Sequence, residues 1–443
     1  MTVKLSDHFT YKRLMHFCLP PIAMMVFTSI YGVIDGLFVS NFVGKTAFAA
    51  VNLVIPFIMI LGGFGFMIGT GGSALVAKTL GEGNEDLANR YFTMLIYFTL
   101  ISGIILSIIG MIFIRPISYF LGATKGMIED CVLYGRVVLF FNAAFMLQNA
   151  FQTFLAAAER PKLGLFTTVI AGVTNIVLDA LFIVGFGWGV EGAAVATGIS
   201  ELVGGLIPLF YFLRPNDSLL RLVKTKMKMR VILKACGNGA SELMSNVSSS
   251  IVSMVYNIQL MKLIGENGVA AYGVLMYVSF IFVAIFIGYT VGTAPIISYH
   301  YGAGNHKELK NLLLKSTLLT ILTGTLMTLV AQTLAGPLAH LFVGYDKELF
   351  TLTKHAFWIF SFSFILAGIN IFISSFFTAL NNGGVSAIIS FLRTLVFQLL
   401  SVLILPLFLH IKGIWLAITV AEVFAFFISF IFILSERKKY QYL

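Results

Sequence analysis

Charged side chains are scarce in this sequence. Asp, Glu, Lys and Arg make up 11% of the 443 residues and apolar residues make up 58%, whereas about 25% of the residues in a typical soluble protein are charged. So few charges cannot cover the surface of a water-soluble fold, which excludes that class. A nucleic-acid-binding surface is also not expected, although the net charge is +10, because a basic patch needs a soluble face.

Cysteine and histidine are rare and form no catalytic or metal-binding pattern. The three Cys lie in or beside apolar runs without a CxxC motif, so neither a disulfide framework nor a redox or zinc site is indicated. The seven His are scattered, and the Gly81 to Asn84 turn lacks the Lys of a phosphate-binding loop. We therefore expect no enzyme activity and no cofactor. With no nucleotide-binding domain visible, any transport would be passive or coupled to an ion.

Long apolar runs, by contrast, are abundant. A membrane helix needs about 20 mostly apolar residues, and the first run is too long for the apolar part of a cleavable signal peptide. We predict an all-α integral membrane protein with twelve transmembrane helices. The runs lie at residues 14–43, 47–78, 91–114, 131–158, 163–186, 192–213, 235–264, 268–299, 312–335, 350–380, 385–410 and 413–434.

The positions of Lys and Arg predict the orientation of the chain in the membrane. If the N-terminus is cytoplasmic, 20 of the 29 Lys and Arg residues fall in cytoplasmic segments and 8 fall in the opposite segments. Cytoplasmic loops carry an excess of these residues. The distribution therefore predicts that both termini are cytoplasmic and that the number of spans is even.

The sequence also repeats itself at an offset of 221 residues. Two halves with six spans each run in the same direction through the membrane, which is a parallel repeat with the substrate site expected between the halves. The repeat predicts two pseudo-symmetric six-helix bundles, residues 1–213 and 235–443, joined by a basic cytoplasmic linker, residues 214–234. The aligned pairs include Gly44 and Gly265, Gly83 and Gly304, Asn84 and Asn305, and Glu201 and Glu422.

Six ionisable side chains fall inside the predicted spans, where a charge costs about 2.5–3.5 kcal/mol on insertion scales. They are Asp35, Asp179, Glu201, Glu242, Arg393 and Glu422. Asp35 and Asp179 have Tyr256 and Leu400 at the repeat offset, so the two halves differ chemically. Each Asp could also serve as a helix cap.

Asn175 lies four residues before Asp179 and therefore shares its helix face. Amide and carboxylate oxygens are the ligands of hard cations, and a carboxylate in a low-dielectric cavity can also take up a proton. We therefore predict a cation or proton site at Asp35, Asn175 and Asp179.

The other intramembrane charges are weaker candidates. Glu242 opens its span and predicts a second cation site in the C-terminal half, or else an interfacial carboxylate near Lys234. Glu201 and Glu422 occupy equivalent places in the repeat, which favours a scaffold role. Arg393 is expected to pair with a carboxylate or a backbone carbonyl.

Three uncharged polar residues of the fourth span, Tyr134, Asn149 and Gln152, are candidates for substrate binding in a central cavity. The 17 Met and 43 Phe residues suit an adaptable apolar cavity, although most are expected to face lipid or the core. Pro20 lies in the same span as Asp35, and proline removes a helix hydrogen bond. We predict a kink there, either static or dependent on the charge of Asp35.

With these residues together, the chain resembles the multidrug and toxic compound extrusion (MATE) transporters, and among them the bacterial MepA-like branch. The resemblance covers essentially the whole chain. It rests on the twelve-span repeat and on the segments at residues 16–20, 29–35, 175–179, 189–197 and 413–417.

The resemblance implies an antiporter of the bacterial inner (plasma) membrane that exports cationic, amphipathic drugs against Na⁺ or H⁺ by alternating access, as a monomer. A second cation site of the family combines a Glu of the seventh span, which matches Glu242, with an acid of the tenth span, where this chain has Asn370. The family's first cation site matches Asp35, Asn175, Asp179 and Thr197.

Two rival hypotheses remain. A flippase of lipid-linked oligosaccharides from the same superfamily would need cationic side chains in its cavity for pyrophosphate, and Arg393 alone lies within a span. An integral membrane enzyme or receptor would need a polar catalytic cluster or a soluble domain, and the sequence shows neither.

Overall fold

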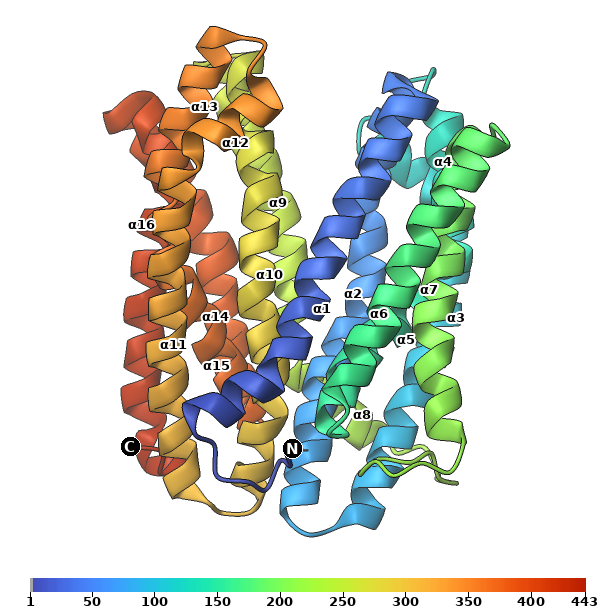
Figure 1. Cartoon of the computed structure of the whole chain (residues 1–443), viewed down its shortest axis with the longest axis vertical. Coiled ribbons are helices and arrows are strands. Elements are labelled where there is room, and N and C mark those ends of the chain that lie inside the picture. The colour runs from blue at the N-terminus through green and yellow to red at the C-terminus, as the bar shows by residue number, and fades with distance from the viewer. Residues whose placement is uncertain (1–2) are drawn as a thin grey trace.

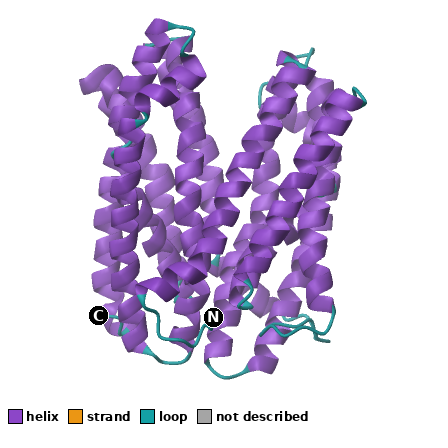
Figure 2. Ribbon diagram, viewed as in Figure 1, coloured by secondary structure: helices purple, strands orange, loops and turns teal. Residues whose placement is uncertain are grey.

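The computed structural model describes residues 3–443, and within that range every regular element is a helix (Figure 2). The helices form two bundles that lie close together at the end carrying both termini and diverge toward the opposite end, which gives the molecule a V shape (Figure 1).

The helices of the first half lie between the N-terminus and the basic segment. They are α1 (Tyr11–Phe38), the π-helical turn η1 (Val39–Val43), α2 (Lys45–Gly81), α3 (Glu85–Phe120), α4 (Ile128–Phe140), α5 (Asn142–Ala157), α6 (Pro161–Asp179), the π-helical turn η2 (Ala180–Gly185) and α7 (Gly189–Leu213).

The second half begins with a short helix inside the segment predicted as linker. Its elements are α8 (Met229–Asn238), α9 (Ala240–Leu263), α10 (Glu266–Gly302), α11 (His306–Thr333), α12 (Ala335–Val343), α13 (Lys347–Phe360), α14 (Ser363–Ala379), α15 (Gly383–Phe391), the π-helical turn η3 (Leu392–Val396) and α16 (Phe397–Tyr440).

Eight helical segments are long and apolar enough to cross a membrane, and up to ten if each of two bent pairs counts as one span. The bent pairs are α4 with α5, at 55°, and α13 with α14, at 47°. The prediction of an all-helical protein with many spans is confirmed, but by this measure the number of spans falls short of the twelve predicted.

The difference has two physical causes. The predicted run at 235–264 is mostly α9, whose apolar residues are diluted by polar ones, including Ser241, Ser245, Ser248, Ser249, Ser250 and Ser253. The runs at 385–410 and 413–434 belong to one segment, Gly383–Tyr440. Within α16 only His410 leaves helical geometry, with φ 49° and ψ −130°.

The internal repeat is visible in the loops that follow α2 and α10. Gly83 and Gly304 both adopt left-handed conformations, with φ of 78° and 67°, which glycine adopts without a steric cost. Directly after them, Asn84 and Asn305 cap the next helix, each accepting a hydrogen bond from the backbone three residues ahead. The repeated GxGN motif is therefore a turn followed by a helix cap.

Reciprocal glycine contacts join α2 and α10 beside these loops. A Cβ on Gly81 would collide with the carbonyl oxygen of Tyr299, and a Cβ on Gly302 would collide with the carbonyl oxygen of Lys78. Tyr299 and Lys78 are themselves related by the 221-residue offset. The two bundles therefore meet through a symmetric pair of backbone contacts that only glycine permits.

Each half also places its opening segment against the other half. Gly292 of α10 packs on Cys18 of α1, where an added Cβ would lie 2.9 Å from the sulfur. At the equivalent positions, Gly71 of α2 packs on the backbone of Gly239, which joins α8 to α9. The bundles are thus interlocked at the end where the termini lie.

The segment before α1 connects the two halves at the same end. The backbone N–H of Leu5 donates to Oε1 of Glu159 at 2.5 Å, in the loop between α5 and α6. The backbone N–H of Phe9 donates to Oε1 of Glu308 on α11 at 2.9 Å, and His8 contacts the other carboxylate oxygen at 2.7 Å. One short segment is therefore bound to both bundles.

Candidate functional site

The strongest candidate site lies in the N-terminal bundle, where α1 and α6 bring Asp35 and Asp179 together. Each helix passes into a π-helical turn shortly after its Asp, η1 after α1 and η2 directly after Asp179. Such turns widen the helix and are frequent at functional sites. The two carboxylates lie within hydrogen-bonding reach of each other.

Two ionised carboxylates cannot bond to each other, because both only accept hydrogen bonds. Oδ1 of Asp35 and both carboxylate oxygens of Asp179 are buried without a hydrogen-bond partner among the described residues. No ion pair within that range involves either side chain. Since buried acceptors need a partner, the pair requires a proton or a cation between its oxygens.

Two more unpartnered oxygens belong to the residues predicted for this site. Oδ1 of Asn175 and Oγ1 of Thr197 are buried and have no partner in the part of the chain that the structure describes. Asn175 is one helical turn before Asp179 on α6, and Thr197 lies on α7, which packs against α6. The set of carboxylate, amide and hydroxyl oxygens has the chemistry that binds a hard cation.

The three predicted substrate residues are all buried, but only one adjoins the carboxylates. Tyr134 on α4 is an electrostatic neighbour of Asp35 and Asp179 and lies beside Thr197. Asn149 on α5 donates from Nδ2 to the carbonyl oxygen of Gly62 on α2 at 3.3 Å, so its amide takes part in helix packing. Gln152, on the same helix, has an unpartnered Oε1 among the described residues.

The C-terminal half holds its charges differently. Arg393 pairs with Glu422, with Nη2 at 2.9 Å from Oε1 and Nε at 3.0 Å from both carboxylate oxygens. Asn370 donates to Oε2 of Glu422 at 2.7 Å and to its backbone carbonyl oxygen at 2.9 Å. The predicted pairing of Arg393 with a carboxylate is confirmed. Glu242, in the first turn of α9, is a neighbour of Arg393.

Pro20 lies near the start of α1, which continues through it as one helix to Phe38. Its ring is buried and lines a cavity of about 420 Å³ together with His16, Glu159 and Lys162. Whether this proline bends α1 during function stays a prediction.

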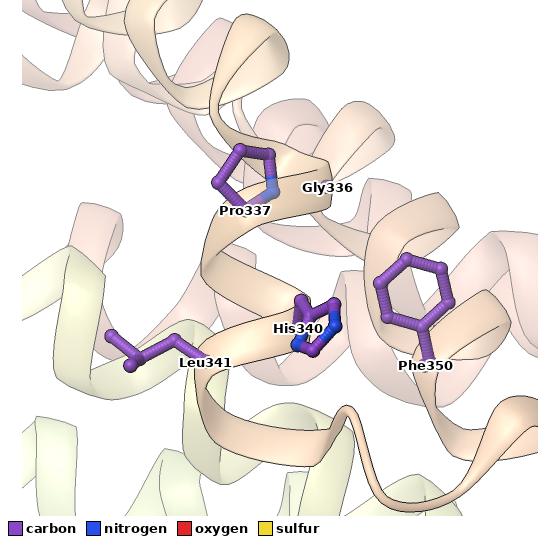
Figure 3. Close-up of a pocket in the computed structure, with 5 residues that line it drawn as sticks. All are labelled: Gly336, Pro337, His340, Leu341 and Phe350. Carbon is purple, nitrogen blue, oxygen red and sulfur yellow. The ribbon is translucent and has the colours of Figure 1, made fainter.

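A surface pocket of about 470 Å³ lies at the far end of the C-terminal bundle, between α12 and α13 (Figure 3). It is lined by Gly336, Pro337, His340, Leu341 and Phe350. It contains no carboxylate, so it lacks the chemistry to hold a cation and is a weaker candidate than the acidic centre of the other bundle.

Glu201 is the residue that sequence reasoning assigned to the scaffold and that the structure places at the site. Its side chain is buried, with 7% exposed, and Oε2 has no hydrogen-bond partner among the described residues. Asp35 is its electrostatic neighbour. The available signal was its spacing, because Glu201 lies four residues after Thr197 and so shares its helix face.

Comparison with known proteins gives a consistent result. A sequence model of the MatE family matches the chain twice, at residues 20–181 and 243–404. The two matched segments are equal in length and lie close to the predicted repeat offset.

Curated relatives cover most of the chain. The multidrug export protein MepA of Staphylococcus haemolyticus is 24% identical over 434 residues, which are 97% of this chain and 94% of that protein. A probable multidrug resistance protein of Bacillus subtilis, YoeA, is 26% identical over 364 residues, 79% of this chain and 77% of its own. A solved structure described as the outward-facing conformation of a multidrug resistance MATE transporter has a TM-score of 0.92 at 23% identity, with 98% of each chain covered.

Proposed function

This chain belongs to the MatE family of membrane transporters, and we propose that it exports cationic, amphipathic compounds in exchange for Na⁺ or H⁺. One observation carries the coupling part of this proposal. Buried oxygens of Asp35, Asn175, Asp179 and Thr197 lack partners within the described residues, and an exchangeable positive charge would satisfy them. The relatives named as multidrug export or multidrug resistance proteins support the class of substrate.

The proposed topology has twelve spans and two cytoplasmic termini. Besides the ten spans found by length and hydropathy, α9 would cross the membrane shielded by its neighbours, and Gly383–Tyr440 would cross twice, reversing at His410. Both termini lie at the end where the bundles meet (Figure 1). With the termini in the cytoplasm, the V would open outward, as in the similar structure described as outward-facing.

The proposed mechanism is alternating access in a monomer. Binding of Na⁺ or H⁺ at Asp35 and Asp179 neutralises the carboxylates and weakens their attraction for a cationic compound. The compound leaves outward, the bundles rock to open inward, and release of the ion restores the negative charge for the next compound. Such coupling requires that ion and compound bind the two states with different affinities.

The test uses inverted membrane vesicles and efflux of the cationic dye ethidium, driven first by a Na⁺ gradient and then by a proton gradient. Asp35→Asn and Asp179→Asn, made separately, should each abolish ion-driven efflux, because an amide cannot exchange a charge. Asp86→Asn, which removes an exposed carboxylate at the start of α3, is the matched control. Full export by both site variants would refute the coupling assignment.

The flippase alternative finds no support in the described residues. Its cavity would need free cationic side chains for pyrophosphate, and the guanidinium of Arg393 is already paired with Glu422. The same vesicles distinguish the two functions, since a flippase would not respond to ethidium.

A further inference from the structure

The internal repeat allows the same three positions to be compared in the two halves. At an offset of 221 residues, Asn370 corresponds to Asn149, Glu422 to Glu201 and Arg393 to Gly172. The C-terminal half holds its buried Glu with an arginine and an asparagine. The N-terminal half keeps the Glu and the Asn but has no arginine at the third position.

The consequence is visible at Glu201. Glu422 accepts bonds at both carboxylate oxygens, three of them from Arg393. Oε2 of Glu201 has no partner within the described residues, although only 7% of the residue is exposed. A buried carboxylate is normally paired, so a positive charge that the chain supplies in one half is missing from its own residues in the other.

Aromatic rings of α1 occupy the place where the arginine would start. A Cβ added to Gly172 would lie 2.5 Å from Cε1 of Phe27 and 2.8 Å from Cδ1 of Tyr31. The two rings stand 5.9 Å apart at 52° to each other, and each is partly exposed. Tyr31 is an electrostatic neighbour of Glu201.

We propose that Glu201, together with the rings of Phe27 and Tyr31, binds the positively charged group of the exported compound. An organic cation gains from both a carboxylate and an aromatic face, whereas a small hydrated ion is better served by the oxygen cluster at Asp35 and Asp179. The inference rests on the proposed function, because it assumes a cationic substrate.

This placement also explains how ion and compound compete. Tyr31 and Asp35 are four residues apart on α1 and therefore lie on one face of that helix. An ion bound at Asp35 and a compound bound over Tyr31 would both act on the same two turns of α1. Binding of one would alter the site of the other through this segment.

Binding of two dyes to the purified full-length protein tests the proposal. Ethidium carries a permanent positive charge and Nile red is uncharged, and both report binding by fluorescence. Glu201→Gln should weaken ethidium binding by about tenfold or more, the scale of one buried charge-assisted contact, and leave Nile red unchanged. Glu191→Gln, an exposed position on the same helix, should change neither dye. Tyr31→Ala should weaken ethidium and Tyr31→Phe should not.

Three results would overturn the proposal. Wild-type ethidium affinity in Glu201→Gln would show that the carboxylate does not bind the cation. Equal weakening of both dyes would show that Glu201 only maintains the cavity. Unchanged ethidium affinity with loss of the effect of Na⁺ or pH would place Glu201 in the ion site. Because binding is measured without transport, failure of the coupling assignment at Asp35 and Asp179 would be seen separately.

Discussion

Replacing Arg393 by methionine leaves Glu422 in place and removes its cationic partner. In the structure Glu422 is 1% exposed and accepts from Nε and Nη2 of Arg393 at 2.9–3.0 Å. Removing one partner of a buried ion pair costs about 3–5 kcal/mol, because the other charge stays buried. Asn370 still donates to Oε2 at 2.7 Å, so we expect the lower end, about 3 kcal/mol.

The assay is the melting temperature of the purified protein in detergent. For a chain of this length, a loss of that size corresponds to a fall of roughly 3–6 °C. The fall should shrink in acid, because a protonated Glu422 no longer needs a cation. Arg393→Met combined with Glu422→Met should recover most of the loss, since apolar replacement of a whole buried pair is often neutral. Asn370 would keep its bond to the backbone carbonyl of residue 422.

Two outcomes would refute this account of the pair. If Arg393→Met melts at the wild-type temperature at neutral pH, the ion pair does not stabilise the bundle. If the double variant is as unstable as the single one, the loss comes from packing of the arginine stem and not from an uncompensated charge.

Two further predictions concern the end where the termini lie. Gly302→Ala should destabilise the protein by about 1–3 kcal/mol by overpacking against the carbonyl of Lys78; Gly336→Ala, with no atom within 4 Å of the added Cβ, is the control, and equal melting temperatures would contradict the contact. Burial raises the pKa of Glu159 above its ordinary 4.5, so docking of the segment around Leu5 should be strongest in acid and weaken as pH rises through that raised pKa. Hydrogen-exchange protection of this segment, corrected for the intrinsic rate, should lose its pH dependence in Glu159→Gln, and an unchanged profile would refute the role of the carboxylate.

The repeat and the acidic pair could be predicted from sequence because they depend on composition and on local spacing. Apolar runs and their offset need no knowledge of packing, and a carboxylate inside such a run, such as Asp35 or Asp179, is conspicuous by its cost. Asn175 followed from helical spacing alone. The structure then showed these side chains close together, which no local pattern can guarantee.

The unequal roles of Glu201 and Glu422 could not be predicted in this way. Both residues stand at the same position of the repeat, and the difference arises from Arg393, which lies on another helix and reaches Glu422 only in the folded bundle. The number of spans was limited for a related reason. The crossing of a serine-containing helix such as α9 depends on neighbours that cover it, and hydropathy does not report them.

The interlocking of the two halves has a consequence for assembly. Cys18 of the first half rests on Gly292 of the second, and Gly239 of the second rests on Gly71 of the first. A half made alone would expose these close-fitting helix faces to lipid, with no side chains to fill the space. Neither half is therefore a self-sufficient folding unit, and during synthesis α1 must wait in the membrane for a surface that is translated more than 200 residues later.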